Sequence, residues 1–254
     1  MSSKLDPSTE VAQTEIDYST KLLNRTEIAE DTFAFEFERP SGFHFKPGQF
    51  IDLTLQQGTG QGAGRLVHTF SIASSQFAPY ISVATRMRDT PFKRALASLP
   101  LGTEIEMRGP MGSFLLHSNP ARPAVLLAGG IGIAPFLSMI SSAAIGSINR
   151  AISLFYANRS LENAAFMGNL LDLAASNKNL RFIPTFTRLK ADHHGWAGAV
   201  GHIDTRLLAA HIGTAQNTIF YIAGPPAMVA AARQSVVDLG VNEDDIRSEE
   251  FLGY

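Results

Sequence analysis

The hydrophobic pattern of this 254-residue chain changes its period near Asn119-Pro120, and that change constrains the fold more than any other feature. Before this point apolar and polar residues alternate in short runs, as in Thr32–Phe37, where three phenylalanines share one face. Turn residues such as Pro40-Ser41-Gly42 and Pro47-Gly48 separate the runs. About six short strands of this kind predict a small antiparallel barrel.

After this point the apolar runs become continuous. The run Ala124–Ala128 contains no polar residue, which is typical of a strand covered on both faces. Strands and helices then alternate, which indicates a doubly wound parallel α/β sheet with crossover helices. The expected segments after the first strand are 151–156, 161–175, 180–186, 204–211, 218–223 and 227–239. We therefore expect a flexible N-terminal arm at 1–19, a barrel domain at 20–119 and an α/β domain at 120–254.

Composition excludes several classes of function. The chain has 21 Lys and Arg against 23 Asp and Glu, so nothing attracts nucleic acid or an anionic membrane in general, and we expect neither as a partner. It has no cysteine, which excludes disulfides, thiolate zinc sites and cysteine-ligated iron–sulfur clusters and fits a reducing, cytoplasmic location. The arm lacks the features of a signal peptide. His193-His194 has no identifiable further ligands, so we expect no metal site.

Three segments carry candidate binding chemistry. Gly129–Pro135 follows a buried strand and opens a helix, and its glycines and free N–H groups suit a phosphate, although the spacing is not Gly-x-Gly-x-x-Gly. His68–Ser74 offers an aromatic ring and hydroxyls, which are what a flavin requires. Ala223-Gly224-Pro225-Pro226 ends a long apolar strand. Taken singly, each segment also fits an ordinary strand or turn that binds nothing.

In this order the three segments resemble the ferredoxin–NADP reductase superfamily, over roughly residues 20–254. The resemblance extends to Pro47-Gly48-Gln49-Phe50, Gly109-Pro110-Met111-Gly112-Ser113-Phe114 and the tail Glu249-Glu250-Phe251. It implies a six-stranded antiparallel Greek-key β-barrel that binds flavin, followed by an NAD(P)-binding domain. The implied enzyme is an FAD-dependent NAD(P)H oxidoreductase, with FMN less expected than FAD. The implied electron partner is a ferredoxin, a flavodoxin or an oxygenase component, served by a stand-alone reductase without an iron–sulfur domain.

The resemblance also implies roles for residues of the barrel. The family pattern Arg-x-Tyr-Ser-x-x-Ser places the flavin ring on Phe70 and the hydroxyl of Ser71 near flavin N5. His68 stands where the family has the arginine that contacts flavin phosphate, and Thr69, between His68 and Phe70, is also expected at the flavin site. Thr90 or Asp89 would cap the next helix, with Pro91 in its first turn, and Thr90 would donate to the phosphate. The candidates to replace the missing charge are Arg65, Arg86, Arg88 and Lys93, of which we favour Arg86.

In the second domain the resemblance implies a dinucleotide site. The residues expected near the pyrophosphate are Gly130, Gly132, Ile133 and Pro135. Thr187-Arg188 and Arg159 follow two strands and are candidates for the 2′-phosphate, which favours NADP(H) slightly over NAD(H). Gly224 and Pro225 would lie by the nicotinamide, where Ala223 replaces a cysteine common in the family.

The tail completes the set of expected catalytic residues, which are Ser71, Glu249 and Phe251. Phe251 is expected to cover the second face of the flavin and to move when nicotinamide arrives, with Tyr254 as an alternative for that role.

Two other functions remain open at this stage. A flavin or ferric reductase would release reduced flavin or pass electrons to metals. A non-catalytic nucleotide-binding subunit, such as a redox sensor, is compatible with the departures at His68 and Ala223.

Overall fold

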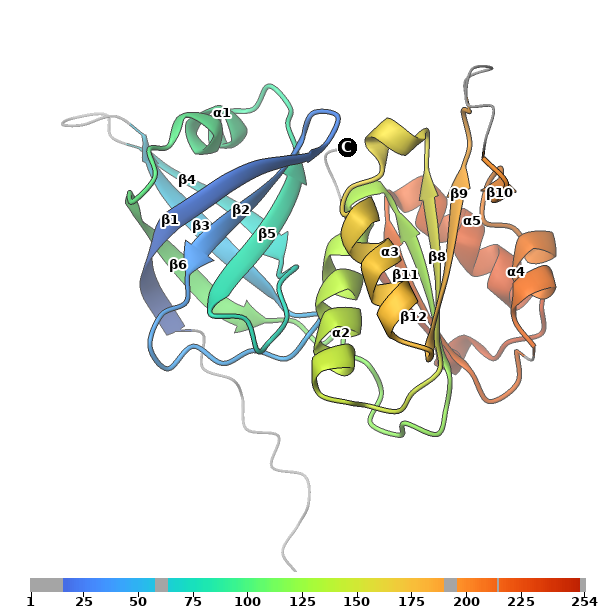
Figure 1. The fold of residues 1–254 in the computed structure, drawn as a ribbon. Helices are drawn as coiled ribbons and strands as arrows, with labels where there is room; N and C mark the ends of the chain where they lie inside the picture. Colours follow the sequence, from blue (N-terminus) through green and yellow to red (C-terminus); the bar gives the residue numbers. More distant parts are fainter. Residues whose placement is uncertain (1–15, 58–63, 190–195, 214, 252–254) are drawn as a thin grey trace, which may run out of the picture.

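The computed structural model describes residues 16–57, 64–189, 196–213 and 215–251. These residues form two six-stranded sheets that lie side by side (Figure 1). The first half of the chain forms an antiparallel sheet and the second half a parallel one, which confirms the predicted fold class. Among the described residues, no helix is both long enough and apolar enough to span a lipid bilayer.

The first sheet is a barrel. Its strands are β1 (Ile16–Ala29), β2 (Thr32–Glu38), β3 (Phe50–Gln57), β4 (Gly64–Ser71), β5 (Tyr80–Arg86) and β6 (Glu104–Met111). They lie in the order β4-β3-β6-β1-β2-β5, a Greek-key arrangement in which β6 inserts between β3 and β1. Ile72, just after β4, bridges to Val83 of β5 and brings the two edges of the sheet together.

The barrel core follows the period of two seen in the sequence. Phe35 and Phe37 of β2 are fully buried, and the polar Glu36 between them is not. Helix α1 (Pro91–Ser98) covers the core, where its Phe92 joins the same cluster. Helix α1 therefore packs against the barrel through its apolar face and closes it.

The structure corrects the boundary of the N-terminal arm. The arm was expected at 1–19, but β1 already begins at Ile16 and pairs there with β6. Thr20 and Leu22 are buried while Asp17, Ser19 and Lys21 are exposed. The strand was missed because the polar Thr20 takes an inward position and weakens the alternation at the start of the strand. Residues 1–15 lie outside the described residues.

The second sheet has the order β10-β9-β8-β7-β11-β12, and all of its strand pairs are parallel. Its strands are β7 (Ala124–Gly129), β8 (Ile152–Asn158), β9 (Leu180–Phe186), β10 (Ala199–Val200), β11 (Ile219–Gly224) and β12 (Ile246–Glu250). The helices are α2 (Ile133–Ile145), α3 (Met167–Ser176), α4 (Thr205–His211) and α5 (Pro226–Val237). Short 3₁₀ turns are η1 (Gly130–Gly132), η2 (Leu161–Asn163) and η3 (Glu243–Asp245).

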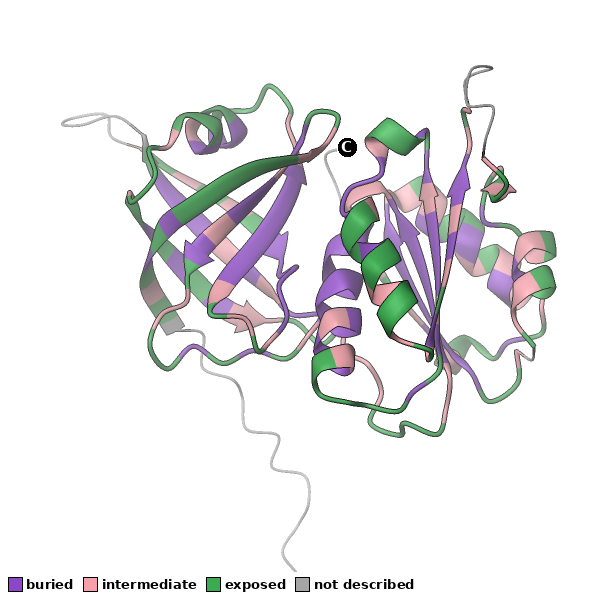
Figure 2. Ribbon diagram, in the orientation of Figure 1, coloured by how far each residue is buried: buried purple, intermediate pink, exposed green. Residues whose placement is uncertain are grey.

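Strand β7 shows why the sheet needs helices on both faces. All six of its residues are buried (Figure 2). Leu126 packs into a cluster with α2 and α3, whereas Val125 and Leu127 pack into another with α4 and α5. A continuous apolar strand can exist only between two covered faces, as its sequence predicted.

The helix predicted at 161–175 is interrupted. Residues 161–163 form η2, and α3 begins only at Met167. Phe166 separates the two with a φ of 59°, in the left-handed region that a helix cannot contain. The sequence pattern did not predict that a bulky residue at this position would adopt a left-handed conformation.

Helix α2 joins the two domains. The hydroxyl of Ser138 donates to the carbonyl of Ser74 at 2.7 Å, and both residues are buried. The hydroxyl of Ser142 accepts from the backbone N–H of Gln76 at 3.0 Å. Buried hydrogen bonds of this kind hold the barrel against the parallel sheet and so define the spaces between them.

Candidate functional site

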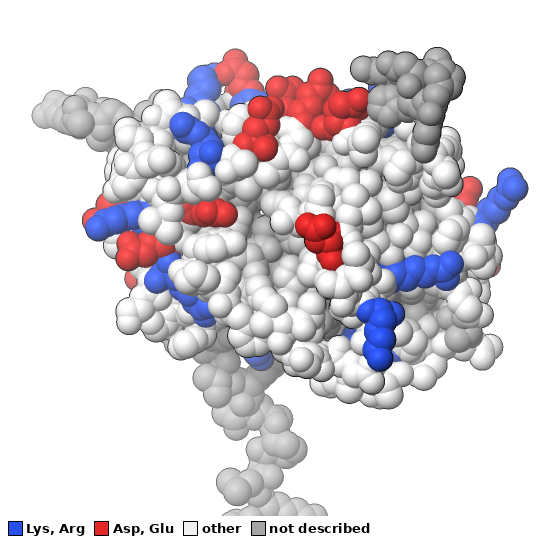
Figure 3. All heavy atoms as spheres, in the orientation of Figure 1, with Lys and Arg blue, Asp and Glu red and all other residues white. Residues whose placement is uncertain are grey.

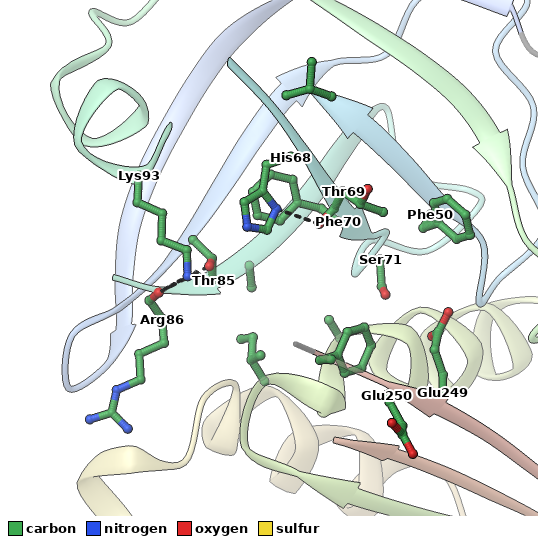
Figure 4. Close-up of a pocket in the computed structure, with 15 residues that line it drawn as sticks. Phe50, His68, Thr69, Phe70, Ser71, Thr85, Arg86, Lys93, Glu249 and Glu250 are labelled. Carbon is green, nitrogen blue, oxygen red and sulfur yellow. Dashed lines mark hydrogen bonds between the residues drawn. The ribbon is translucent and has the colours of Figure 1, made fainter. Parts of the chain in front are cut away.

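A cavity of about 510 Å³ lies where the barrel meets the parallel sheet, and we call it the barrel pocket (Figure 4). Residues from β4, the end of β5, helix α1, the start of α2 and the end of β12 converge on it. The lining residues are Phe50, Val67, His68, Thr69, Phe70, Ser71, Ala84, Thr85, Arg86, Lys93, Ile131, Ala134, Glu249, Glu250 and Phe251. The sequence analysis did not identify Ile131 and Ala134, which flank two residues that it did name.

On β4, the rings of His68 and Phe70 lie nearly parallel, with their centroids 4.5 Å apart. Phe70 is only 5% exposed because its ring also belongs to the barrel core. His68 is half-buried, and the ring of Phe92 lies 5.2 Å from it. Burial holds the pKa of His68 below its usual range, and the nearby Lys93 ammonium lowers it further. His68 therefore offers the pocket a neutral aromatic ring.

Two cations from the barrel reach this pocket. Lys93 is 7% exposed, and its ammonium donates to the backbone carbonyl of Arg86 at 2.7 Å. Burial lowers the pKa of Lys93, and the charge of Arg88 adds to the effect. The guanidinium of Arg86 extends away from His68 and Lys93 in Figure 4.

Thr90, which is expected to contact a ligand, does not line the barrel pocket. It caps α1 instead, because its hydroxyl accepts from the backbone N–H of Lys93 at 3.3 Å. Pro91 follows in the first turn, as predicted. The cap stabilises the helix that carries Lys93.

The C-terminal strand supplies the opposite wall of the pocket. Glu249 pairs in register with Ala223, and the backbone N–H of Phe251 donates to the carbonyl of Gly224 at 3.0 Å. The Oε2 atom of Glu249 is buried without a hydrogen-bond partner, and burial raises the pKa of this carboxyl to about 7. Ser71 points toward this wall in Figure 4. Tyr254, the alternative to Phe251, lies outside the described residues.

A second cavity, of about 340 Å³, lies at the carboxyl ends of the parallel strands, and we call it the sheet-edge pocket. Crevices at this end of such sheets are the usual ligand sites of α/β folds. Its lining residues are Glu30, Thr32, Arg86, Arg88, Gly129, Gly130, Ile131, Ala157, Asn158, Arg159, Asn163, Ala165, Thr187, His202, Pro225 and Met228. Arg86 and Ile131 line both pockets, so the two cavities adjoin.

The glycines of the two turn motifs have different roles. Gly130, with a φ of 54°, lines the sheet-edge pocket, as does Pro225. A Cβ on Gly132 would lie 2.3 Å from the carbonyl oxygen of Ala223, so Gly132 allows η1 to approach β11. Likewise, a Cβ on Gly224 would lie 3.2 Å from the backbone of Gly129. These two glycines therefore shape the pocket by packing and do not line it.

Ile133 and Pro135 line neither pocket. Both are buried in the first turn of α2, and Ile133 belongs to the core between that helix and the sheet. The motif was interpreted as a contiguous ligand surface, but a helix turns successive side chains to different sides. Of this segment, Gly129, Gly130, Ile131 and Ala134 line a pocket, and Gly132, Ile133 and Pro135 do not.

The basic residues after β8 and β9 lie next to each other. The backbone N–H of Arg188 donates to the carbonyl of Arg159 at 2.7 Å, and the N–H of Thr187 donates to that of Asn158 at 2.9 Å. Arg159 and Thr187 line the sheet-edge pocket, whereas Arg188 is exposed beyond it. The structure thus brings the three predicted residues to one place.

The charge of the sheet-edge pocket favours an anionic ligand. Arg86, Arg88 and Arg159 line it, against a single carboxylate, Glu30. That carboxylate accepts from the side-chain amide of Asn163 at 2.7 Å, across the two domains. Three guanidinium groups around one cavity attract phosphates.

Neither pocket shows the features of a metal site. Among residues 16–57, 64–189, 196–213 and 215–251, no three His, Asp or Glu side chains gather as metal ligands would. His193 and His194 lie outside these ranges.

A third cavity, of about 660 Å³, runs between β5 and helices α2 and α3. Its only charged lining residues are Glu36 and Asp172, and Figure 3 shows that this side of the molecule carries few charges between the domains. Of the three motif segments, only the last two residues of His68–Ser74, Ala73 and Ser74, line it.

Comparison with known proteins gives a consistent result for both halves of the chain. A family model described as an oxidoreductase FAD-binding domain matches residues 19–115, and one described as an oxidoreductase NAD-binding domain matches residues 126–234. The chain is 29% identical to the reductase component of a propane 2-monooxygenase from Mycolicibacterium smegmatis, over 84% of this chain and 60% of that protein. It is 26% identical to a glycine betaine monooxygenase reductase subunit from Chromohalobacter salexigens, over 87% of this chain and 60% of that protein.

Solved structures share the fold. A ferredoxin NADP⁺ reductase from Neisseria gonorrhoeae, with bound FAD and NADP, is 25% identical with a TM-score of 0.76, and the match covers 92% of this chain and 98% of that one. An Amycolatopsis cytochrome P450 reductase is 22% identical with a TM-score of 0.80, over 93% of this chain and 70% of that one. The chain spans about 60% of the length of the two monooxygenase relatives.

Proposed function

The chain belongs to the ferredoxin reductase-like superfamily, and on that premise we propose that it is an FAD-dependent NAD(P)H oxidoreductase that supplies electrons to a separate acceptor. The observation that carries this proposal is the contact between the two pockets, which share Arg86 and Ile131. Hydride transfer requires the two reacting rings to approach to about 3–3.5 Å. Adjoining pockets meet that requirement without a large rearrangement of the domains.

The residues of the barrel pocket fit a flavin. The pocket offers an aromatic ring at His68, a hydroxyl at Ser71 and a buried ammonium at Lys93. It also holds the unpartnered Oε2 of Glu249, whose pKa near 7 lets the carboxyl donate a hydrogen bond when protonated. A bound flavin would supply the chemistry of accepting two electrons together and releasing them singly. The protein positions the ring, excludes water and holds a proton at Glu249.

The sheet-edge pocket fits the phosphates of a nicotinamide dinucleotide. Gly130 permits close approach of the backbone, and Arg159 and Thr187 stand at the ends of neighbouring strands. Arg188, adjacent to Arg159, adds a second guanidinium that could bind a 2′-phosphate. This pair supports NADP(H) as the preferred nucleotide.

The acceptor that we propose is a one-electron protein partner, such as a ferredoxin, a flavodoxin or an oxygenase component. Support comes from the relatives, which are reductase components of monooxygenases.

The test is spectroscopic. Purified protein should be yellow, should keep its flavin through gel filtration, and should bleach when NADPH is added without oxygen, at lower concentration than with NADH. Loss of the flavin during gel filtration, with activity restored by added flavin, would instead indicate a flavin reductase. A colourless protein that binds no added FAD would contradict the proposal and favour a nucleotide-binding subunit without catalysis.

A further inference from the structure

His68 stands where the family pattern has an arginine, and the structure shows that it does not replace the charge. Its ring lies against Phe70 at 4.5 Å, and its Nδ1 atom lies 2.9 Å from the carbonyl oxygen of Thr69. Burial and the neighbouring Lys93 both lower the pKa of His68. A flavin phosphate therefore needs a cation from elsewhere in the barrel pocket.

The other basic candidates are directed to different surroundings. Arg65 forms an ion pair with Glu106 and does not line the barrel pocket. Arg88 lines only the sheet-edge pocket. The guanidinium of Arg86 extends away from the rings of β4 in Figure 4.

Lys93 differs from these arginines in its burial. It is 7% exposed, lines the barrel pocket, and has no carboxylate partner among the ion pairs of the described residues. Its ammonium has three N–H donors, and the structure pairs it with one protein acceptor, the carbonyl of Arg86 at 2.7 Å. A buried cation with spare donors and no counter-ion is costly unless an anion binds beside it.

We propose that Lys93, on helix α1, is the cation that binds the flavin phosphate in this chain, and that His68 contributes the face of its ring. The positive charge that the family pattern has on strand β4 is thus supplied here by the helix that closes the barrel. His68 contacts the ligand by stacking, with the face of its ring that is turned away from Phe70. This inference rests on the proposed flavin-dependent function and names the residue that carries its phosphate subsite.

The test measures dissociation constants of FAD, FMN and riboflavin for the flavin-stripped full-length chain, by quenching of flavin fluorescence. Lys93→Gln removes the charge but can still donate a hydrogen bond to Arg86, and Lys93→Met removes both. We expect both variants to bind FAD and FMN about 10- to 100-fold more weakly, as for loss of a charge-assisted hydrogen bond. Riboflavin, which has no phosphate, should bind as it does to the wild type.

Three further variants separate charge from stacking. Arg65→Met, on β4 but outside the pocket, should leave all three constants unchanged. His68→Leu should weaken the binding of all three flavins by a similar factor, because stacking does not depend on the phosphate. His68→Arg in the Lys93→Gln background should restore much of the lost FAD affinity by returning a cation to β4.

The outcomes are distinct. If the wild type binds FAD and both Lys93 variants bind it equally well, this inference is overturned and the proposed function stands. If the dissociation constant of riboflavin rises in the Lys93 variants by the same factor as that of FAD, Lys93 has a structural role and the inference is again overturned. If the wild type binds none of the three flavins, the proposed function fails and this inference fails with it.

Discussion

The two pockets of this molecule are built in different ways. The barrel pocket is lined by aromatic, hydroxyl and charged residues from several elements, among them β4, the end of β5, helix α1, the start of α2 and the end of β12. The sheet-edge pocket depends on backbone, because Gly130 lines it and Gly132 and Gly224 allow the segments around it to approach each other. Substitutions in the first should therefore act on ligand binding locally, and glycine substitutions in the second should act through the fold.

The largest effect should come from Gly132→Ala. A Cβ there would lie 2.3 Å from the carbonyl oxygen of Ala223, so backbone must move, and we expect the free energy of unfolding to fall by about 3 kcal/mol. Denaturant titration measures this change. The matched control is Gly168→Ala in α3, where no atom lies within 4 Å of the new Cβ and where we expect a gain of up to about 1 kcal/mol. Equal stabilities of the two variants would contradict the packing role of Gly132.

The next effect concerns the arginines at the strand ends. We expect Arg188→Ala to raise the KM for NADPH about tenfold, and the double change with Arg159→Ala about 100-fold, because each guanidinium binds phosphate strongly. The KM for NADH should change far less. The control is Arg181→Ala, which should alter neither constant, because the guanidinium of Arg181 donates to the carbonyl of His211 and lines neither pocket. An equal rise in the KM for NADH and for NADPH would show that these arginines do not bind the 2′-phosphate.

A smaller effect should appear in the pH dependence of stability. Burial raises the pKa of Glu249 from 4.5 to about 7, so the folded state of the flavin-free protein holds a proton that the unfolded state releases. Stability contributed by this carboxyl is present below pH 4.5 and is lost as the pH rises through 7. We expect Glu249→Gln to be more stable than the wild type by about 1–2 kcal/mol at pH 8, after allowance for its partial exposure. The two proteins should unfold alike at pH 4; a constant difference at all pH values would rule out the titration of Glu249.

The smallest effect should come from Phe251→Ser. If the ring occupies space that nicotinamide needs, its removal should lower the Kd of NADP⁺ about fivefold, because displacement of the ring no longer reduces affinity. Flavin should stay bound, and the preference between the two nucleotides should change. Phe251→Tyr keeps the ring and should behave as the wild type. Unchanged nucleotide binding in Phe251→Ser would remove Phe251 from the proposed mechanism.

Local patterns in the sequence determined the architecture. Alternation in Thr32–Phe37 and the continuous run Ala124–Ala128 predicted the two kinds of sheet, because a strand with one covered face and a strand with two need different residues. The order of the motifs predicted the family. It also predicted that His68, Phe70, Glu249 and Phe251 lie at one site, and all four line the barrel pocket. The prediction that failed locally was the start of β1, where the inward residue Thr20 is polar.

Only the tertiary structure decided which residues of each motif face a ligand. In the structure Gly132, Ile133 and Pro135 pack against neighbouring elements, and Ile131 lines both pockets. It also buried Lys93 beside His68, although 25 positions of sequence separate them. The physical reason is that a side chain's direction and its partners depend on how whole elements pack, and short sequence patterns record only the face of an element that is buried.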